Sequence, residues 1–156
     1  MATGDVKWFR RALLDLGTGV HNLSTATLRL GIVTTAVVPT VDTADPRWGA
    51  GGSTNFSTNQ VATGGTSYTG PVALGTVTWT QVSNIPTLRA ANVSLAQDAS
   101  GFTNGAYGII YNDTAAGKQA LGWVEISAGG SASLVSGPIV IDWNGANGDI
   151  FTITQA

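Results

Sequence analysis

Charged side chains are scarce in this 156-residue chain, which has seven Lys and Arg against nine Asp and Glu and a formal net charge of −2. About a quarter of the residues of an average soluble domain are charged, whereas here the share is 10%. No basic patch of the kind that binds nucleic acid or an anionic membrane surface is present. We therefore expect no nucleic-acid and no membrane partner, and we interpret so uncharged a surface as one that other protein partly covers.

Cysteine is absent, which excludes disulfides and thiolate metal sites. No apolar run approaches the roughly 20 residues that are needed to span a bilayer. The first residues lead into Arg10 and Arg11 without the apolar core of a secretory signal, so we expect synthesis in a cytoplasm. The length of the chain predicts one domain over residues 1–156.

Few side chains could carry out catalysis. The one histidine, His21, has no Gly-x-Ser-x-Gly motif to accompany it, and we interpret it as a solvated loop residue. Glu125 and Asp142 lie on two predicted strands, and the sequence leaves open whether they meet as a glycosidase pair would. Residues 142–149 superficially resemble a calcium loop, but the EF-hand spacing fails and paired Asn-Gly turns explain the same letters. We predict no enzyme activity, no cofactor and no metal site.

One helical pattern opens the chain. Asp5 is placed to cap it and Gly17 to end it, while Phe9, Leu13 and Leu16 recur at three- and four-residue spacing. We predict a short amphipathic helix over residues 5–16 that directs these three apolar side chains to one face.

From residue 25 onward the apolar period changes from 3.6 to 2, which predicts β-strands. Both faces are apolar over residues 121–126, as expected for a central strand, and a change of phase near Gly75 predicts a bulge or tight bend. The predicted fold is all-β: a single-domain antiparallel β-sandwich, jelly-roll-like, with one short N-terminal helix. The predicted strands lie within residues 27–33, 72–82, 91–95, 107–111, 121–126, 139–143 and 150–154.

Residues 39–59 show no sustained period, and we predict a long loop there. Trp48 and Phe56 are costly to leave in water, so one interpretation is an arm that becomes ordered against a neighbouring subunit. The other interpretation is a mobile surface loop.

The five tryptophans also allow two interpretations. Those at 79, 123 and 143 lie on predicted strands and belong to the predicted core. The other two tryptophans, Trp8 and Trp48, are not assigned to the core, and their rings could stack on sugar rings or contact another protein. The predicted contact residues are aromatic and arginine side chains of the helical segment and the long loop: Trp8, Phe9, Arg10, Arg11, Arg47, Trp48 and Phe56.

Several stretches match one known pattern in order along most of the chain. They include A-T-L-R-L-G-I-V-T-T after the helical opening, Q-V-A-T-G-G-T-S-Y, A-Y-G-I-I-Y-N-D-T and a closing I-D-W-N…I-F-T-I-T hairpin. Together they resemble a family of small structural proteins of tailed bacteriophages. The chain departs from that pattern at Gly31, at Gly64 and Gly65, and in the enlarged loop 39–59. The matching stretches are residues 8–14, 26–35, 60–68, 106–114, 141–144 and 150–154.

The resemblance implies a non-enzymatic virion component, made in the host bacterial cytoplasm. It implies a capsid decoration or cement protein that binds the outer surface of the head and stabilises contacts between major capsid subunits. The implied partners are the major capsid protein and copies of the chain itself, as a homo-oligomer within the virion. The alternative is a receptor-binding or tail- or fibre-associated module that recognises a host surface glycan. A cellular carbohydrate-binding module, a tail-tube subunit and a small hydrolase are further alternatives.

Overall fold

The structure of the chain is a computed structural model that describes residues 2–127, 131–143 and 148–154. Over these residues it confirms the predicted all-β class, with a single short α-helix and one 3₁₀ turn. The elements in chain order are β1 (Ala2–Gly4), β2 (Lys7–Trp8), α1 (Arg10–Gly17), β3 (Leu28–Val33), β4 (Pro46–Arg47), β5 (Thr54–Asn55), the 3₁₀ turn η1 (Phe56–Asn59), β6 (Val72–Ala73), β7 (Thr78–Val82), β8 (Ile85–Arg89), β9 (Val93–Leu95), β10 (Tyr107–Asn112), β11 (Ala120–Glu125), β12 (Ile139–Trp143) and β13 (Asp149–Thr152).

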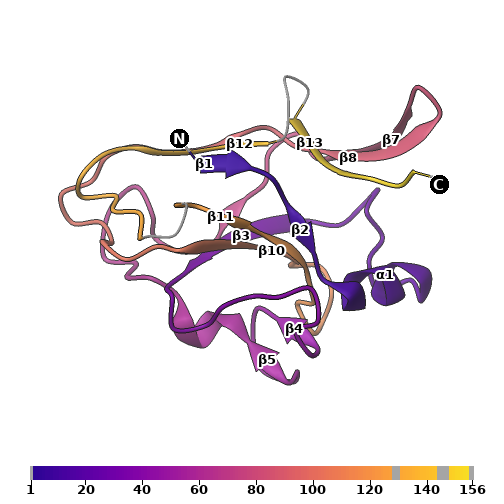
Figure 1. The fold of residues 1–156 in the computed structure, drawn as a ribbon, viewed down its shortest axis with the longest axis horizontal. Helices are drawn as coiled ribbons and strands as arrows, with labels where there is room; N and C mark the ends of the chain where they lie inside the picture. Colours follow the sequence, from indigo (N-terminus) through magenta and orange to yellow (C-terminus); the bar gives the residue numbers. More distant parts are fainter. Residues whose placement is uncertain (1, 128–130, 144–147, 155–156) are drawn as a thin grey trace.

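The strands form two layers in a sandwich-like arrangement (Figure 1). The lower layer is a five-stranded antiparallel sheet with the order β2-β11-β10-β3-β6. The upper layer contains two three-stranded sheets, β1-β12-β9 and β13-β8-β7. β1 pairs with β12 in parallel, as β4 does with β5, and the other pairs are antiparallel. The sandwich-like architecture is therefore present, and the jelly-roll connectivity stays a prediction.

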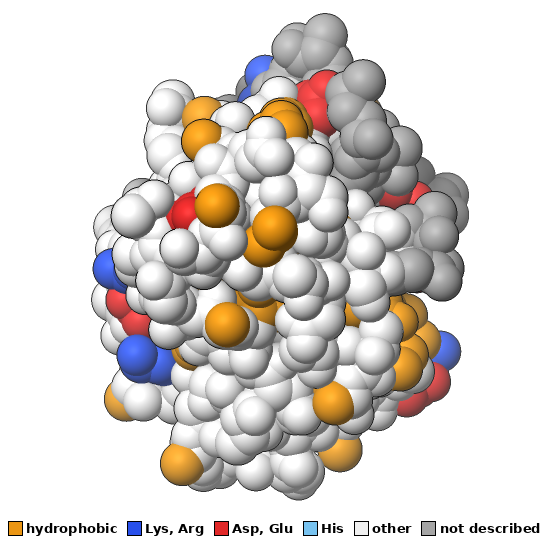
Figure 2. Space-filling view, turned by 90° about the vertical axis from the view of Figure 1, so that its left-hand side faces the viewer, with side chains coloured by type: hydrophobic (Ala, Val, Ile, Leu, Met, Phe, Trp, Pro, Cys, Tyr) orange, Lys and Arg blue, Asp and Glu red, His pale blue; other side chains and the backbone are white. Residues whose placement is uncertain are grey.

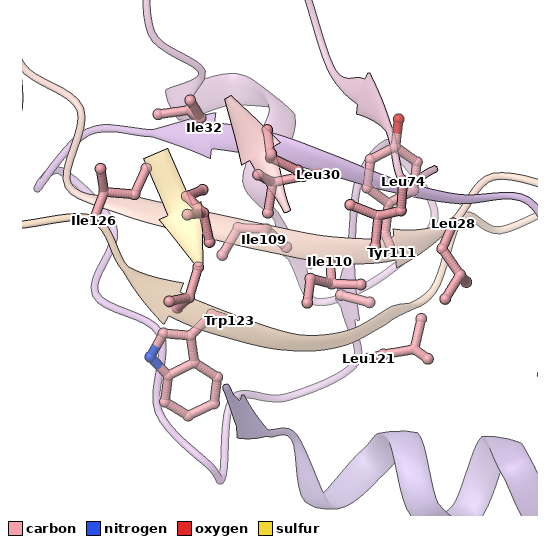
Figure 3. Packing of buried hydrophobic residues seen from close by; sticks show 14 of the residues in the cluster. Leu28, Leu30, Ile32, Leu74, Ile109, Ile110, Tyr111, Leu121, Trp123 and Ile126 are labelled. Carbon is pink, nitrogen blue, oxygen red and sulfur yellow. The ribbon is translucent and has the colours of Figure 1, made fainter. Parts of the chain in front are cut away.

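The central strands of the lower sheet are buried on both faces. In each of β3, β10 and β11, five of the six residues are buried. Since successive side chains of a strand point to opposite faces, both faces of this sheet need an apolar cover. The upper layer covers one face. Figure 3 shows Trp123 and Leu121 on the side toward α1, so the N-terminal third of the chain supplies the second cover.

The predicted long loop 39–59 is part of this second cover. Trp48 is 6% exposed and stacks on Tyr111, with the ring centroids 5.3 Å apart. Phe56 begins η1 with no exposed surface and lies against Phe9, which in turn packs on Trp123 with ring centroids 4.8 Å apart. The interpretation as an arm ordered only by a neighbour, and that as a mobile loop, are both wrong for these aromatic side chains, because the chain's own sheet buries them.

The helix begins later than the predicted residues 5–16. Lys7 and Trp8 form β2, which pairs with β11, and α1 follows after Phe9, whose N–H bonds the Leu121 carbonyl at 3.1 Å. Asp5 is therefore not the cap. The inward face of α1 carries Ala12 and Asp15. Leu13 therefore points outward and is 51% exposed. The prediction that Leu13 shares a buried face with Phe9 is wrong.

The predicted strands are present, with two differences in how they pair. Residues 72–82 divide into β6 and β7, which belong to different sheets, so the chain passes from one layer to the other near Gly75. The last two strands do not form a closing hairpin, because β12 pairs with β1 and β9 whereas β13 pairs with β8.

Candidate functional site

Three of the seven predicted contact residues are core side chains. Phe9, Trp48 and Phe56 are 0%, 6% and 0% exposed. A Cβ atom at Gly31 would lie 2.2 Å from the Trp48 ring, so the indole rests directly on the bare backbone of β3. Burial raises the pKa of the hydroxyl of Tyr111, whose ring stacks on the indole, to about 12. The prediction that Phe9, Trp48 and Phe56 contact a partner is wrong, because their surface is already used inside the chain.

Trp8 belongs to a row of aromatic rings across the two layers. It is half-buried and lies on Phe151, with ring centroids 3.9 Å apart, and Phe151 lies on Trp79 at 6.4 Å. A groove of about 450 Å³ beside the row is also lined by Asp5 and Asp149. The row connects β2, β13 and β7, so it fixes the β7–β8 hairpin to the rest of the fold.

The arginines of the predicted surface are paired within the chain. The Arg10 guanidinium lies 2.5 Å from Asp42, and Arg47 makes two bonds of 3.2 and 3.1 Å to Asp45. The remaining basic residues are paired in the same way: Arg11 with Asp15, Lys7 with Glu125, Arg29 and Lys118 with Asp113, and Arg89 with Asp149. All seven Lys and Arg side chains thus have an acidic partner within the chain.

Much of the surface has no charge at all. No charged residue occurs between Arg47 and Arg89. Figure 2 shows the end of the molecule opposite α1, where most described atoms are backbone or uncharged polar side chains and the hydrophobic side chains are scattered. Contacts made by such a surface depend on hydrogen bonds and apolar burial rather than on charge.

Exposed apolar side chains gather at α1. Leu13 and Leu14 are 51% and 55% exposed, and Val41, at 41%, lies beside the first turn because its carbonyl accepts the Arg10 N–H at 2.9 Å. The ion pair of Arg10 with Asp42 flanks them. We call these five residues the α1 surface. An apolar centre with a polar rim is the composition of a protein–protein interface.

The sequence prediction included Arg10 in this surface but missed the other four members. Two adjacent leucines on a two-turn helix could have revealed it, since neighbours 100° apart cannot both lie at the centre of the inward face. The three- and four-residue spacing instead predicts Leu13 on the inward face. Val41 and Asp42 carry no such signal, because only the fold brings them to the helix.

A buried polar cluster lies beneath α1. His21 is 3% exposed and its Nδ1 is 3.4 Å from the Asn112 amide nitrogen, so the prediction of a solvated loop residue is wrong. The Asp15 side chain, 2% exposed, accepts a bond from Arg11, and its backbone carbonyl accepts the N–H groups of Val20 and His21. Burial lowers the pKa of His21, and the negative charge of Asp15 opposes this shift. The cluster fixes the segment that follows the helix.

The other chemical candidates are held in local contacts. Glu125 pairs with Lys7 at 3.0 Å, and Asp142 accepts a bond from Asn92 at 2.6 Å. Most of the calcium-like loop, residues 144–147, lies outside the described residues. In the part of the chain that the structure describes, no group of three or more His, Asp and Glu side chains could hold a metal ion. No helix there is long and apolar enough to cross a membrane.

Compared with known proteins, the chain matches no family model, no curated protein and no solved structure.

Proposed function

We propose that this chain is a structural protein of a bacteriophage particle. It acts by binding rather than by chemistry, as a decoration or cement protein on the outer surface of the head that stabilises contacts between major capsid subunits. The observation that carries the proposal is the α1 surface, where Leu13 and Leu14 are more than half exposed on a helix fixed to a well-packed sheet.

The exposed leucines leave apolar area for a partner to bury. Full burial of a leucine contributes about 1.5–3 kcal/mol, so a side chain that is half exposed can contribute about 1 kcal/mol more on binding. Burial of the α1 surface therefore contributes only a small binding free energy to each copy. Modest contacts suit a protein repeated over a particle, where many copies act together.

Three of the six stretches that resemble the phage family include residues of the central sheet or of its contacts. Residues 26–35 contain β3 and residues 106–114 contain β10, and the two strands pair from Tyr107–Val33 to Asn112–Leu28. The hydroxyl of Tyr68, in a third stretch, accepts the N–H of Ile32 at 2.9 Å. The likeness therefore involves residues that form the central sheet.

Glycan recognition is the alternative, and Trp48 does not favour it. One face of its indole is covered by Tyr111 and the ring rests on the backbone of Gly31. A sugar would have to displace this packing before it could stack there. The α1 surface offers leucines instead of an open aromatic face.

The direct test adds the purified protein to matching mature capsids that lack it and measures cosedimentation. The proposal expects binding in near-stoichiometric amounts with the major capsid protein and a higher temperature of particle disruption. No binding to expanded capsids refutes it. A hexameric ring detected by light scattering supports a tail-tube subunit instead.

Variants of the α1 surface locate the contact. Leu13→Ala and Leu14→Ala are each expected to weaken capsid binding by about 1 kcal/mol, or about fivefold, while thermal unfolding stays close to wild type. Ile153→Ala is the matched control, because Ile153 is 42% exposed but lies outside the α1 surface. If the double leucine variant binds like the wild type and like this control, the α1 surface is not the contact.

A further inference from the structure

The β7–β8 hairpin has an open edge. Among the described residues β7 pairs with β8 alone, and Figure 1 shows the hairpin extending from the upper layer away from the body. β7 has five residues, whereas the other strands at sheet edges have two to four. It is thus the longest described strand with an unpaired side.

The register of the hairpin determines which backbone groups are unpaired. Ser83 and Asn84 both have positive φ, 49° and 66°, as a two-residue type I′ turn requires, so Val82 and Ile85 form the hydrogen-bonded closing pair. Hydrogen-bonded and non-hydrogen-bonded pairs then alternate along the strands. Gln81 falls in a non-hydrogen-bonded pair opposite Pro86, which has no N–H to donate.

The carbonyl of Pro86 supports this assignment. It accepts the N–H of Ile153 at 3.0 Å, so the Pro86 backbone points toward the β13 side and away from β7. By the same alternation, Trp79 and Gln81 direct their N–H and C=O groups away from β8. These four groups form the open edge, while the backbone of Thr80 points at β8.

The open edge lacks the features that usually block pairing with another chain. Natural edge strands carry charged side chains, proline or bulges that prevent it. β7 reads T-W-T-Q-V, has no register shift against β8, and lies in the uncharged run between Arg47 and Arg89. Thr78, Thr80 and Gln81 are exposed. The unpaired backbone groups of this edge can bond those of another extended strand. Because the edge carries no charge, the partner strand that fits it is also uncharged.

We propose that β7 pairs in antiparallel orientation with β7 of a second copy of this chain, across a two-fold axis at Thr80. The outward groups of Trp79 then bond those of Gln81 in the other copy, twice by symmetry, and the two Thr80 residues form a non-hydrogen-bonded pair. The second copy is the occupant because antiparallel pairing makes the edge its own complement. Thr78 then faces Val82, so the pairing opposes no like charges. It joins two upper layers into one continuous sheet, in free protein with no capsid present.

A cysteine crosslink tests this register. The chain has no cysteine, so Thr80→Cys introduces a single thiol. Cα atoms of a non-hydrogen-bonded antiparallel pair lie about 4.5 Å apart, within disulfide range. Mild oxidation is expected to give a disulfide-linked dimer. Thr152→Cys, at an exposed threonine on β13, the opposite edge of the same sheet, is the matched control and is expected to stay monomeric on a denaturing gel. Equal crosslinking of both variants overturns the proposal.

Charge substitutions test the pairing in solution. Thr80→Lys and Thr80→Glu each place like charges opposite one another, and each is expected to weaken dimerisation about fivefold or more in sedimentation equilibrium. An equimolar mixture of the two variants is expected to recover a dimer, whereas Thr152→Lys is expected to dimerise like the wild type. Wild-type protein that is monomeric at every concentration, or a mixture that does not recover, refutes the pairing.

Amide exchange gives a readout that is independent of substitutions. The N–H groups of Thr78 and Thr80 are bonded to β8 in a single chain and are expected to be protected at every concentration. Those of Trp79 and Gln81 are expected to gain protection only as concentration rises. Protection of Trp79 and Gln81 that does not change with concentration contradicts the proposal.

Discussion

The contact between Trp48 and Gly31 gives the sharpest test of the fold. In Gly31→Ala the new Cβ would meet three carbons of the indole ring at 2.2 to 2.5 Å, far inside van der Waals contact. The ring cannot move outward without giving up its stacking on Tyr111, where the interplanar angle is 7°. Ordinary overpacking costs about 1–3 kcal/mol, whereas loss of a buried tryptophan costs about 3–5 kcal/mol. We expect Gly31→Ala to lower the free energy of unfolding by about 3 kcal/mol.

A double-mutant cycle separates this clash from any general intolerance of β3. Trp48→Ala removes the indole, and an alanine at 31 then meets no ring. Glycine within a strand is less stable than alanine by about 0.5–1 kcal/mol, so in that background Gly31→Ala should be neutral or slightly stabilising. The assay is urea unfolding followed by far-ultraviolet circular dichroism, because Trp48→Ala alters the fluorescence. An equal cost of Gly31→Ala in both backgrounds would refute the reasoning and the position of loop 39–59 on the sheet.

The remaining predictions concern pH and the contacts proposed above. Burial lowers the pKa of His21 below 6.5, so the unfolded chain binds more protons and stability should fall as pH drops below 6.5, with a flatter profile in His21→Gln. Hydrogen bonds from the N–H groups of Ser67, Ser100 and Thr66 lower the pKa of Asp98 to about 2, so its contribution is present above 3.8 and lost as pH falls toward 2. Thermal unfolding across pH should show that loss, and a wild-type profile in Asp98→Asn would contradict it. Capsid cosedimentation should locate the α1 surface, and crosslinking through Thr80→Cys should locate the β7 edge.

Alternation of apolar residues predicts most of the longer strands, because side chains that point to one face of a strand recur at every second residue. The run at 121–126 predicts more than a central strand. Because it is apolar on both faces, it also predicts that other segments of the protein pack on each face of the sheet. The sequence could not say which segment supplies the second cover. Loop 39–59 does so through single contacts, such as Trp48 in the space above Gly31, and such contacts leave no period to detect.

The predicted inward face of the helix is wrong for a different reason. The apolar stripe predicts the buried face of the helix, but the inward face contains Asp15, whose carboxylate accepts a bond from the Arg11 guanidinium. With Asp15 inward, Leu13 turns outward. The prediction of a solvated His21 has other grounds, namely the missing Gly-x-Ser-x-Gly motif and the position of His21 in the connector after the helix.

The scarcity of charge has two structural sources, and they differ in what they allow a partner to contact. Part of the uncharged run between Arg47 and Arg89 is interior: Trp48, Phe56 and Leu88 are buried, and neither a charge nor a partner could reach them. The other part is surface, and β7 belongs to it. All seven basic side chains are already matched with acids. The association proposed for β7 and for the α1 surface would therefore draw its free energy from backbone hydrogen bonds and apolar burial, which salt screens little.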